Sequence, residues 1–424
     1  MTLQQIDEKH IWHPYTQHKT ARQPIVISRG EGALLWDEND KEYIDAIASW
    51  WVNPFGHSNK IIADAIYKQL TTLEHVLFGG FTHEPAVRLT QKLVEILPSN
   101  QQKIFFSDNG STAVEVAIKV ALQFFFNKGD KRTTIVAFEN AFHGDTFAAM
   151  AASGISFYTQ AFAGMFIDVI RIPVPIQGKE QQSFDALEAA IKAHNIAGFI
   201  FEPLVQGAAG MVMYDPEPLD RLIEICQTNN ILTIADEVMT GFGKTGKTFA
   251  CDYLTRQPDM ICLSKALTGG TIPMAITTFT QQIFDGFYSD DINKALFHGH
   301  TFTANPTGCA ASIASIELLR TDEMQHNIKR INERHHKFAE HLNANPKVVT
   351  TRVLGVILAL EVVTSEDNSY YGSIRNKLYD FFIEKGIIMR PVGNIVYILP
   401  PYIITDQQLD KVYSVIDDAL KHVV

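Results

Sequence analysis

The sequence predicts an α/β protein with a large domain, whose mostly parallel sheet is covered by helices, and a smaller α+β domain built from both chain ends. The composition over 424 residues, 46% hydrophobic and 20% charged, is that of a globular protein and excludes a disordered or coiled-coil chain. Short apolar runs alternate with helical periodicity in the middle of the chain. Such runs are typical of buried parallel strands separated by helices.

The expected central strands end in polar or small residues and are followed by helical patterns. They cover 103–107, 134–138, 197–201, 231–235 and 260–264. Helical periodicity at about 111–126 and 217–228 separates some of them. Ligands of open α/β sheets bind beyond the carboxyl ends of the strands, so we look for chemistry there.

The two chain ends have a different pattern. Short strand-like runs at 25–28 and 33–36 predict an antiparallel ribbon. The later elements are a long helical stretch at about 305–342 and strands at 353–363, 387–390 and 395–399. We therefore expect residues 1–54 and 316–424 to form the small domain and 55–315 the large one.

Charge and cysteine content exclude several classes of function. There are 36 Lys and Arg against 47 Asp and Glu, a net charge of −11, which argues against a nucleic-acid or anionic-membrane partner. The four cysteines form no CxxC pair, so neither a disulfide framework nor a metal site is expected. The first residues lack a signal-peptide pattern, and no apolar run approaches the ~18 residues of a membrane span. These features predict a cytoplasmic protein.

Residues 241–248 match the phosphate-loop pattern GxxxxGK[ST]. The preceding strand, however, leads directly into Asp236 and Glu237, whose charges oppose a nucleotide triphosphate. Residues 248–252 are also a poor start for the helix that should follow such a loop. We expect a glycine-rich surface turn rather than a nucleotide site.

Asp236 and Lys265 are more informative together than alone. Separately, they would be an ordinary turn carboxylate and an ordinary solvated lysine. They are 265 − 236 = 29 residues apart, which is enough for the chain to leave one strand and return along the next. Both side chains can therefore reach the same sheet edge. An amine nucleophile beside a fixed carboxylate suits pyridoxal phosphate, whose ring nitrogen must stay protonated to draw electrons.

Such a cofactor also needs a site for its phosphate and a surface for its ring. Gly110 and Ser111 lie between an expected strand and helix, where backbone amides favour an anion. Thr112 and Glu115 also fit an ordinary capping box, and the two functions are compatible. Phe142 follows another strand and offers an aromatic face, although it could equally pack in the core.

Two motifs resemble a known family. Residues 236–243 and 264–270 resemble the fold-type I pyridoxal phosphate aminotransferases of the ornithine/4-aminobutyrate subgroup, and the resemblance spans nearly the whole chain. Further segments resemble the branch of this subgroup that converts 8-amino-7-oxononanoate to 7,8-diaminononanoate in biotin biosynthesis. These segments are 10–16, 49–51, 75–80, 143–147, 390–393 and 399–404.

The resemblance implies roles for the matched cofactor residues. Lys265 would hold the cofactor covalently and shuttle the proton, and Asp236 would pair with the pyridine nitrogen. Gly110 and Ser111 would bind the phosphate, and Phe142 would stack on the ring. Lys265 and Phe142 are also expected to contact the substrate.

The resemblance further implies a homodimer with active sites at the subunit interface. Gly299, His300 and Thr301 match the segment that reaches the cofactor phosphate of the neighbouring subunit, and Gly299 is also expected near the substrate. For the oxo-acid substrate, the resemblance implies contacts with three side chains. Tyr15 would contact its chain, Trp50 would line its pocket and Arg390 would bind its carboxylate.

Some positions depart from the family pattern. Phe142 replaces the usual tyrosine, His300 a common proline, Lys244 the usual arginine and Met239 a frequent glutamine. The amino donor is expected to be S-adenosylmethionine, with lysine as an alternative because Phe142 lacks the hydroxyl. Two rival interpretations are an aminotransferase of the same fold acting on another ω-amine and a non-catalytic relative.

Overall fold

The computed structural model describes residues 1–154, 158–365 and 372–424. Its main sheet has the order β4-β12-β11-β10-β7-β5-β6. The strands are β4 (Lys103–Ser107), β5 (Thr134–Phe138), β6 (Val169–Ile172), β7 (Ile196–Phe201), β10 (Leu232–Asp236), β11 (Met260–Leu263) and β12 (Ala275–Phe279). All neighbours pair in parallel except β12, which runs against both of its partners. The predicted mostly parallel α/β sheet is confirmed.

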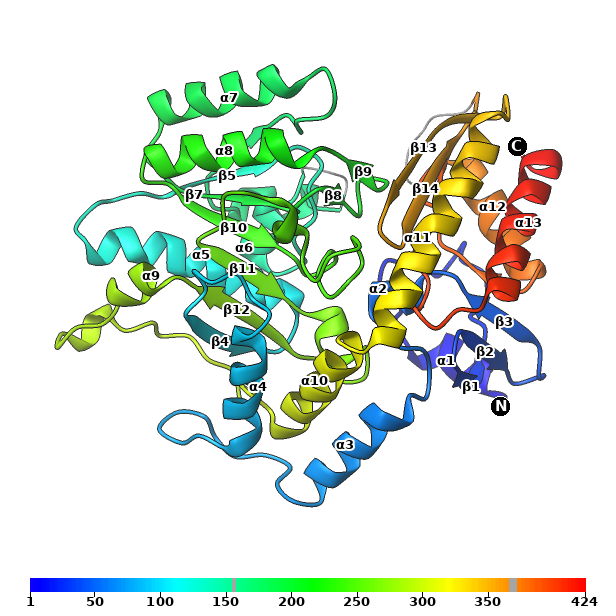
Figure 1. Cartoon of the computed structure of the whole chain (residues 1–424), viewed down its shortest axis with the longest axis horizontal. Helices are drawn as coiled ribbons and strands as arrows, with labels where there is room; N and C mark the ends of the chain where they lie inside the picture. The colour runs from blue at the N-terminus through cyan, green and yellow to red at the C-terminus, as the bar shows by residue number, and fades with distance from the viewer. Residues whose placement is uncertain (155–157, 366–371) are drawn as a thin grey trace.

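Helices cover both faces of this sheet (Figure 1). The covering helices are α5 (Gly110–Asn127), α6 (Phe147–Ala152), α7 (Glu180–Ala193) and α8 (Pro216–Thr228). Along β5, Ile135 and Ala137 belong to the core on the α5 side, whereas Val136 and Phe138 belong to the core on the α8 side. Because side chains alternate along a strand, an all-apolar strand fills two cores at once.

A second lobe combines the two ends of the chain, and both termini lie in it (Figure 1). Its four-stranded sheet has the order β1 (Ile27–Glu31), β2 (Leu34–Asp37), β3 (Glu42–Asp45) and β15 (Ile387–Ile388). A three-stranded sheet has the order β13 (Val348–Leu354), β14 (Ile357–Val362) and β16 (Ile395–Ile398). Its helices include α11 (Asp322–Asn343), α12 (Ser373–Glu384) and α13 (Asp406–His422). The exact domain boundaries stay a prediction.

The remaining elements connect these parts. They are α1 (Leu3–His10), α2 (Ala48–Trp51), α3 (Lys60–Leu70), α4 (Glu84–Val94), α9 (Gln281–Asp285), α10 (Pro306–Leu319), the ribbon β8 (Val205–Gln206) with β9 (Val212–Met213), and four 3-10 turns: η1 (Gln160–Met165), η2 (Ala250–Tyr253), η3 (Lys265–Thr268) and η4 (Ile292–Lys294). Among the residues that the structure describes, no helix is long and apolar enough to cross a membrane.

Two expectations about the second lobe are wrong in detail. The helical stretch at 305–342 is two helices, α10 and α11, because the Thr321 hydroxyl accepts a hydrogen bond from Met324 N and starts a new helix. The run at 353–363 is not one strand. It contains the turn of the β13–β14 hairpin, where Gly355 has φ +58°.

Candidate active site

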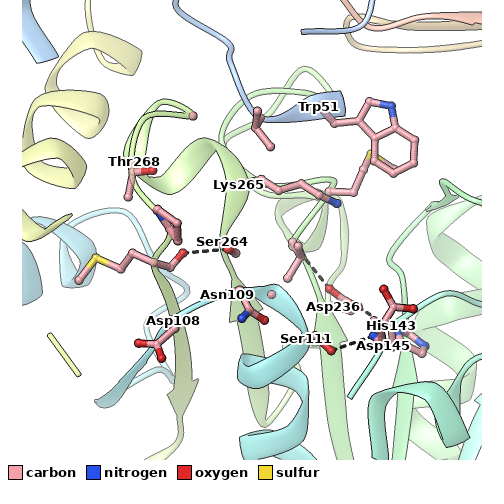
Figure 2. A pocket seen from close by; sticks show the side chains of 18 of the residues that line it. Trp51, Asp108, Asn109, Ser111, His143, Asp145, Asp236, Ser264, Lys265 and Thr268 are labelled. Carbon is pink, nitrogen blue, oxygen red and sulfur yellow. Dashed lines mark hydrogen bonds and ion pairs between the residues drawn. The ribbon is translucent and has the colours of Figure 1, made fainter. Parts of the chain in front are cut away.

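A cavity of about 510 Å³ lies at the carboxyl ends of β10 and β11 (Figure 2). Its lining includes Trp51, Gly110, Ser111, Phe142, Asp236 and Lys265. Five of these six residues were expected at the site from the sequence, and Trp51 was not. Parallel strands deliver their carboxyl ends to one edge, which explains why residues so distant in the chain meet here.

Asp236 and Lys265 reach the cavity from neighbouring strands. Asp236 is the last residue of β10 and pairs in register with Cys262 of β11, and Lys265 begins η3 just beyond β11. Burial lowers the pKa of Lys265, while the nearby carboxylates of Asp236 and Glu202 oppose that shift. Lys265 also has φ +48°, an uncommon conformation for a lysine and one found at functional sites.

His143 orients the carboxylate of Asp236. Nδ1 of His143 lies 2.7 Å from Oδ2 of Asp236, and Val238 N donates to Oδ1 at 3.1 Å. The imidazole is buried, and its Nε2 has no hydrogen-bond partner within the described chain. The sequence offered only a weak signal for this role, since His143 follows Phe142 directly after a strand. An acceptor-only carboxylate held in this way suits a protonated ring nitrogen.

The start of α5 forms the other end of the cavity. Asn109 caps the helix: its side chain accepts from Thr112 N at 3.0 Å, and the Thr112 hydroxyl accepts from Asn109 N at 3.1 Å. The expected Thr112–Glu115 capping box is therefore wrong. Glu115 instead accepts from the amides of Ala148 and Ala149 at the start of α6.

Two glycines keep this end of the cavity open. A Cβ on Gly110 would lie 2.6 Å from Val238 Cγ1, and a Cβ on Gly144 would lie 2.3 Å from Ser111 Oγ. The Ser111 hydroxyl accepts from the amides of Asp145 and Thr146, each at 2.9 Å. The first amides of a helix have no partner within the helix, so those of Gly110 and Ser111 can take an anion. The residues present thus fit a phosphate-bearing cofactor.

Glu202 is a buried acidic group in the cavity wall that the sequence did not reveal. Its Oε1 accepts from Phe142 N at 3.0 Å and its Oε2 from Gly207 N at 2.9 Å. Burial raises the pKa of Glu202 to about 7, His143 opposes the rise and Asp236 adds to it. This carboxyl group fixes the backbone of Phe142, whose half-exposed ring lines the cavity.

The Trp50–Trp51 pair is carried by a left-handed turn. Residues Ala48, Ser49, Trp50 and Trp51 have φ of 45°, 48°, 77° and 71°. Each non-glycine residue in this conformation costs about 1–2 kcal/mol. Trp51 is buried, and Nζ of Lys265 lies 4.8 Å from the centre of its ring.

Trp50 faces another direction and brings together two further expected residues. Tyr15 meets its ring edge-on, with 6.0 Å between ring centres, and the Arg390 guanidinium lies 4.4 Å from the centre of the indole. The Tyr15 hydroxyl donates to the Asp145 carboxylate at 2.6 Å. Tyr15, Trp50 and Arg390 therefore form a group beside the cavity and are not part of its lining.

The 299–301 segment does not line the cavity of its own chain. Gly299 and Thr301 are exposed, and none of the three residues lines the cavity. His300 Nδ1 lies 2.8 Å from Asp108 Oδ2, which does line it.

A partly buried amine, a strand-end carboxylate and a helix N-terminus around one cavity define a fold-type I enzyme that uses pyridoxal phosphate. The model of the class-III aminotransferase family matches residues 15–420, and the chain belongs to this family. It is therefore a pyridoxal phosphate-dependent aminotransferase.

Individual relatives cover the chain from end to end. A protein of Synechococcus elongatus named adenosylmethionine-8-amino-7-oxononanoate aminotransferase is 44% identical over 98% of this chain and 99% of its own length. The solved structure of a protein of that name from Methanocaldococcus jannaschii matches with a TM-score of 0.94 and 33% identity, covering 99% of each chain. A transaminase from the marine bacterium Virgibacillus matches with a TM-score of 0.93 and 28% identity, covering 100% of this chain and 99% of its own.

Proposed function

We propose that the enzyme aminates 8-amino-7-oxononanoate to 7,8-diaminononanoate, a step of biotin biosynthesis, with S-adenosylmethionine as amino donor. The observation that carries this proposal is the relative of that name, which is 44% identical along essentially the whole chain. The intact pair of Lys265 and Asp236 around one cavity argues against a non-catalytic relative.

The cofactor residues have separate tasks in the proposed mechanism. Pyridoxal phosphate, when bound, supplies an electron sink for the carbon that carries the amine. Nζ of Lys265 would move a proton between the substrate carbon and the cofactor carbon in each half-reaction, and its lowered pKa favours the neutral form needed for this task. Asp236, oriented by His143, holds a proton on the ring nitrogen. The α5 amides hold the phosphate.

The acceptor is an apolar chain with a carboxylate, and the group beside the cavity suits it. Trp50 offers an apolar wall, Tyr15 contacts the chain and Arg390 binds the carboxylate. The guanidinium carbon of Arg390 lies 4.4 Å from the centre of the Trp50 ring. A guanidinium in this place can bind a carboxylate as a bidentate pair.

We further propose a cytoplasmic homodimer. Gly299 and Thr301 are exposed and do not line their own cavity, which agrees with a role at the neighbouring subunit's phosphate site. Four buried free cysteines agree with a reducing compartment.

The test separates the two half-reactions. The purified holoenzyme is mixed with S-adenosylmethionine or with lysine, and the visible absorbance of the cofactor is followed in a stopped-flow instrument. We expect S-adenosylmethionine to bleach it and 8-amino-7-oxononanoate then to restore it. Bleaching by lysine alone would change the assigned donor. Failure of 8-amino-7-oxononanoate to restore the absorbance, with restoration by another oxo compound or aldehyde, would overturn the proposed acceptor.

A further inference from the structure

Asp45, the last residue of β3, holds the left-handed turn Ala48–Trp51 in place. Its Oδ1 accepts from Ile47 N at 3.2 Å and from Ser49 N at 3.0 Å. Its Oδ2 accepts from the Ser49 hydroxyl at 2.8 Å. The Asp45 side chain is completely buried, so these contacts replace the water that the carboxylate has lost.

A fourth contact fixes the Asp45 carboxylate from beyond the turn. Nε2 of His57 lies 2.9 Å from Asp45 Oδ2, and Nδ1 of His57 lies 3.1 Å from Asn53 Nδ2. With the Asn53 amide in this orientation, its nitrogen donates to His57 Nδ1, and His57 Nε2 carries the hydrogen that points to Asp45. Donors on both sides of the turn therefore converge on one carboxylate.

The left-handed turn directs the adjacent side chains of Trp50 and Trp51 to different surroundings. Trp51 lies at the cavity beside Lys265, and Trp50 lies outside it, against Tyr15 and Arg390. Strained backbone of this kind persists only where surrounding contacts impose it, and such strain gathers at functional sites. Asp45 itself does not line the cavity. Its contacts act on the cavity only through the turn.

We propose that Asp45 is a positioning residue for the amino acceptor: its carboxylate fixes the left-handed turn and thereby sets the two tryptophan walls against which the acceptor packs. This inference rests on the proposed function, because it takes Trp50 and Trp51 as part of the acceptor site. Asp236, Lys265 and the phosphate-binding amides lie on β10, η3 and α5, outside the turn. Of these, Lys265 contacts the turn, with Nζ 4.8 Å from the centre of the Trp51 ring.

Asp45→Asn in the holoenzyme is the main test. Asparagine offers one oxygen in place of two, and its NH2 group must face at least one of the donors. We expect the KM for the acceptor to rise about tenfold or more, the effect of losing hydrogen bonds to a buried charge. The rate of the donor half-reaction should change less than the acceptor KM, because the substitution alters no residue assigned to the cofactor. The near-ultraviolet circular dichroism of the tryptophans should also change.

Asp64→Asn is the matched control. Asp64 is an exposed carboxylate on α3 that pairs with Lys60, and its loss should change neither the acceptor KM nor the dichroism.

A second pair of variants tests the turn without touching Asp45. Ser49→Gly loses the hydroxyl donor but accepts positive φ readily, so the acceptor KM should stay near that of the wild type. Ser49→Val loses the same donor and disfavours positive φ, so it should raise the acceptor KM as Asp45→Asn does. If Asp45→Asn does not fold, this pair of variants still shows whether the left-handed turn sets the acceptor KM.

Three results would overturn the role of Asp45: a wild-type acceptor KM with unchanged tryptophan dichroism in Asp45→Asn, equal losses in both half-reactions, or equal behaviour of the two Ser49 variants. Failure of the proposed function is a different result, since the wild type itself would not aminate 8-amino-7-oxononanoate. The dichroism of Asp45→Asn would then still report on the turn.

Discussion

The cavity of the large lobe and the α11–α13 core, where His335 of α11 packs against Tyr413 of α13, both bury ionisable groups, but with different consequences. In the cavity, burial lowers the pKa of Lys265 and raises that of Glu202 to about 7, and both groups border open space. In the α11–α13 core, burial lowers the pKa of His335 to about 3. His335 lies 2.7 Å from the Tyr413 hydroxyl through Nδ1 and 3.1 Å from Val356 O through Nε2, so both ring nitrogens are used.

The difference shows that a shifted pKa alone does not identify a catalytic group. His335 has a large shift and two fixed partners, and it does not line the cavity, so its role is structural. Lys265 has a shifted pKa together with an accessible cavity and a facing carboxylate, and that combination supports chemistry. Variants of the two regions should therefore separate loss of activity from loss of stability.

The largest expected effect belongs to the cavity. Lys265→Ala should abolish transamination, a loss of roughly a thousandfold or more, because the covalent attachment and the proton carrier disappear together. Steady-state turnover and the visible spectrum of the cofactor measure this. Far-ultraviolet circular dichroism should show a folded chain. Normal turnover in this variant would contradict the assignment of the active site.

The next effect belongs to the α11–α13 core and concerns stability. The unfolded chain protonates His335 below its ordinary pKa of 6.5, whereas the folded chain resists until about pH 3. The free energy of unfolding therefore falls as the pH drops through this window, by about 5 kcal/mol at most. The two pKa values differ by 6.5 − 3 = 3.5, and each pH unit between them corresponds to about 1.36 kcal/mol.

His335→Gln should flatten this acid dependence, because glutamine can serve both partners without titrating. Urea unfolding at several pH values between 4 and 7, roughly the window just given, measures the change. His336→Gln alters the exposed neighbour and is the control. An unchanged acid slope in His335→Gln would show that other groups dominate acid unfolding.

A smaller effect should come from Glu202. Its pKa of about 7 means that the folded protein keeps this proton while the unfolded chain loses it above about pH 4.5, so Glu202 makes the fold less stable as the pH rises towards 7. Its ionisation also adds a negative charge near Asp236 and His143. We expect the donor half-reaction to show an inflection near pH 7 that Glu202→Gln removes, with rates changing by less than about tenfold.

Stopped-flow absorbance across this pH range measures the inflection in Glu202→Gln. Glu139→Gln replaces an exposed carboxylate near the same loop and should leave the inflection in place. Persistence of the inflection in Glu202→Gln would assign it to another group.

The sequence predicts what depends on local pattern. Apolar runs and their helical spacing were enough for most strands of the main sheet and for the meeting of Asp236 with Lys265 at its edge. The end of one helix and the start of another at Thr321, and the hairpin turn at Gly355, were not predicted. At each place a single residue ends the element although the apolar pattern continues. The strands β6 and β12 were not among the predicted ones, and apolar content does not encode the antiparallel direction of β12.

The unforeseen parts of the site depend on contacts between distant segments. Glu202 acquires its role by accepting amides from Phe142 and Gly207, and His143 by meeting Asp236 across the sheet. Trp51 reaches the cavity only because the turn around it is left-handed. No spacing rule in the sequence reports such contacts.

The smallest expected effect belongs to Lys247, in the loop that matches a phosphate-binding pattern. Its Nζ donates to Asp252 O at 2.8 Å and lies 4.2 Å from the centre of the Tyr253 ring, and the loop leads into the 3-10 turn η2 rather than an α-helix. Without helix amides behind it, the loop lacks the main source of phosphate affinity. Lys247→Ala should keep turnover within about twofold and stability within about 0.5 kcal/mol, as surface substitutions usually do. Titration calorimetry with ATP completes the test. Micromolar binding that Lys247→Ala removes would show that this loop is a second ligand site despite its structural context.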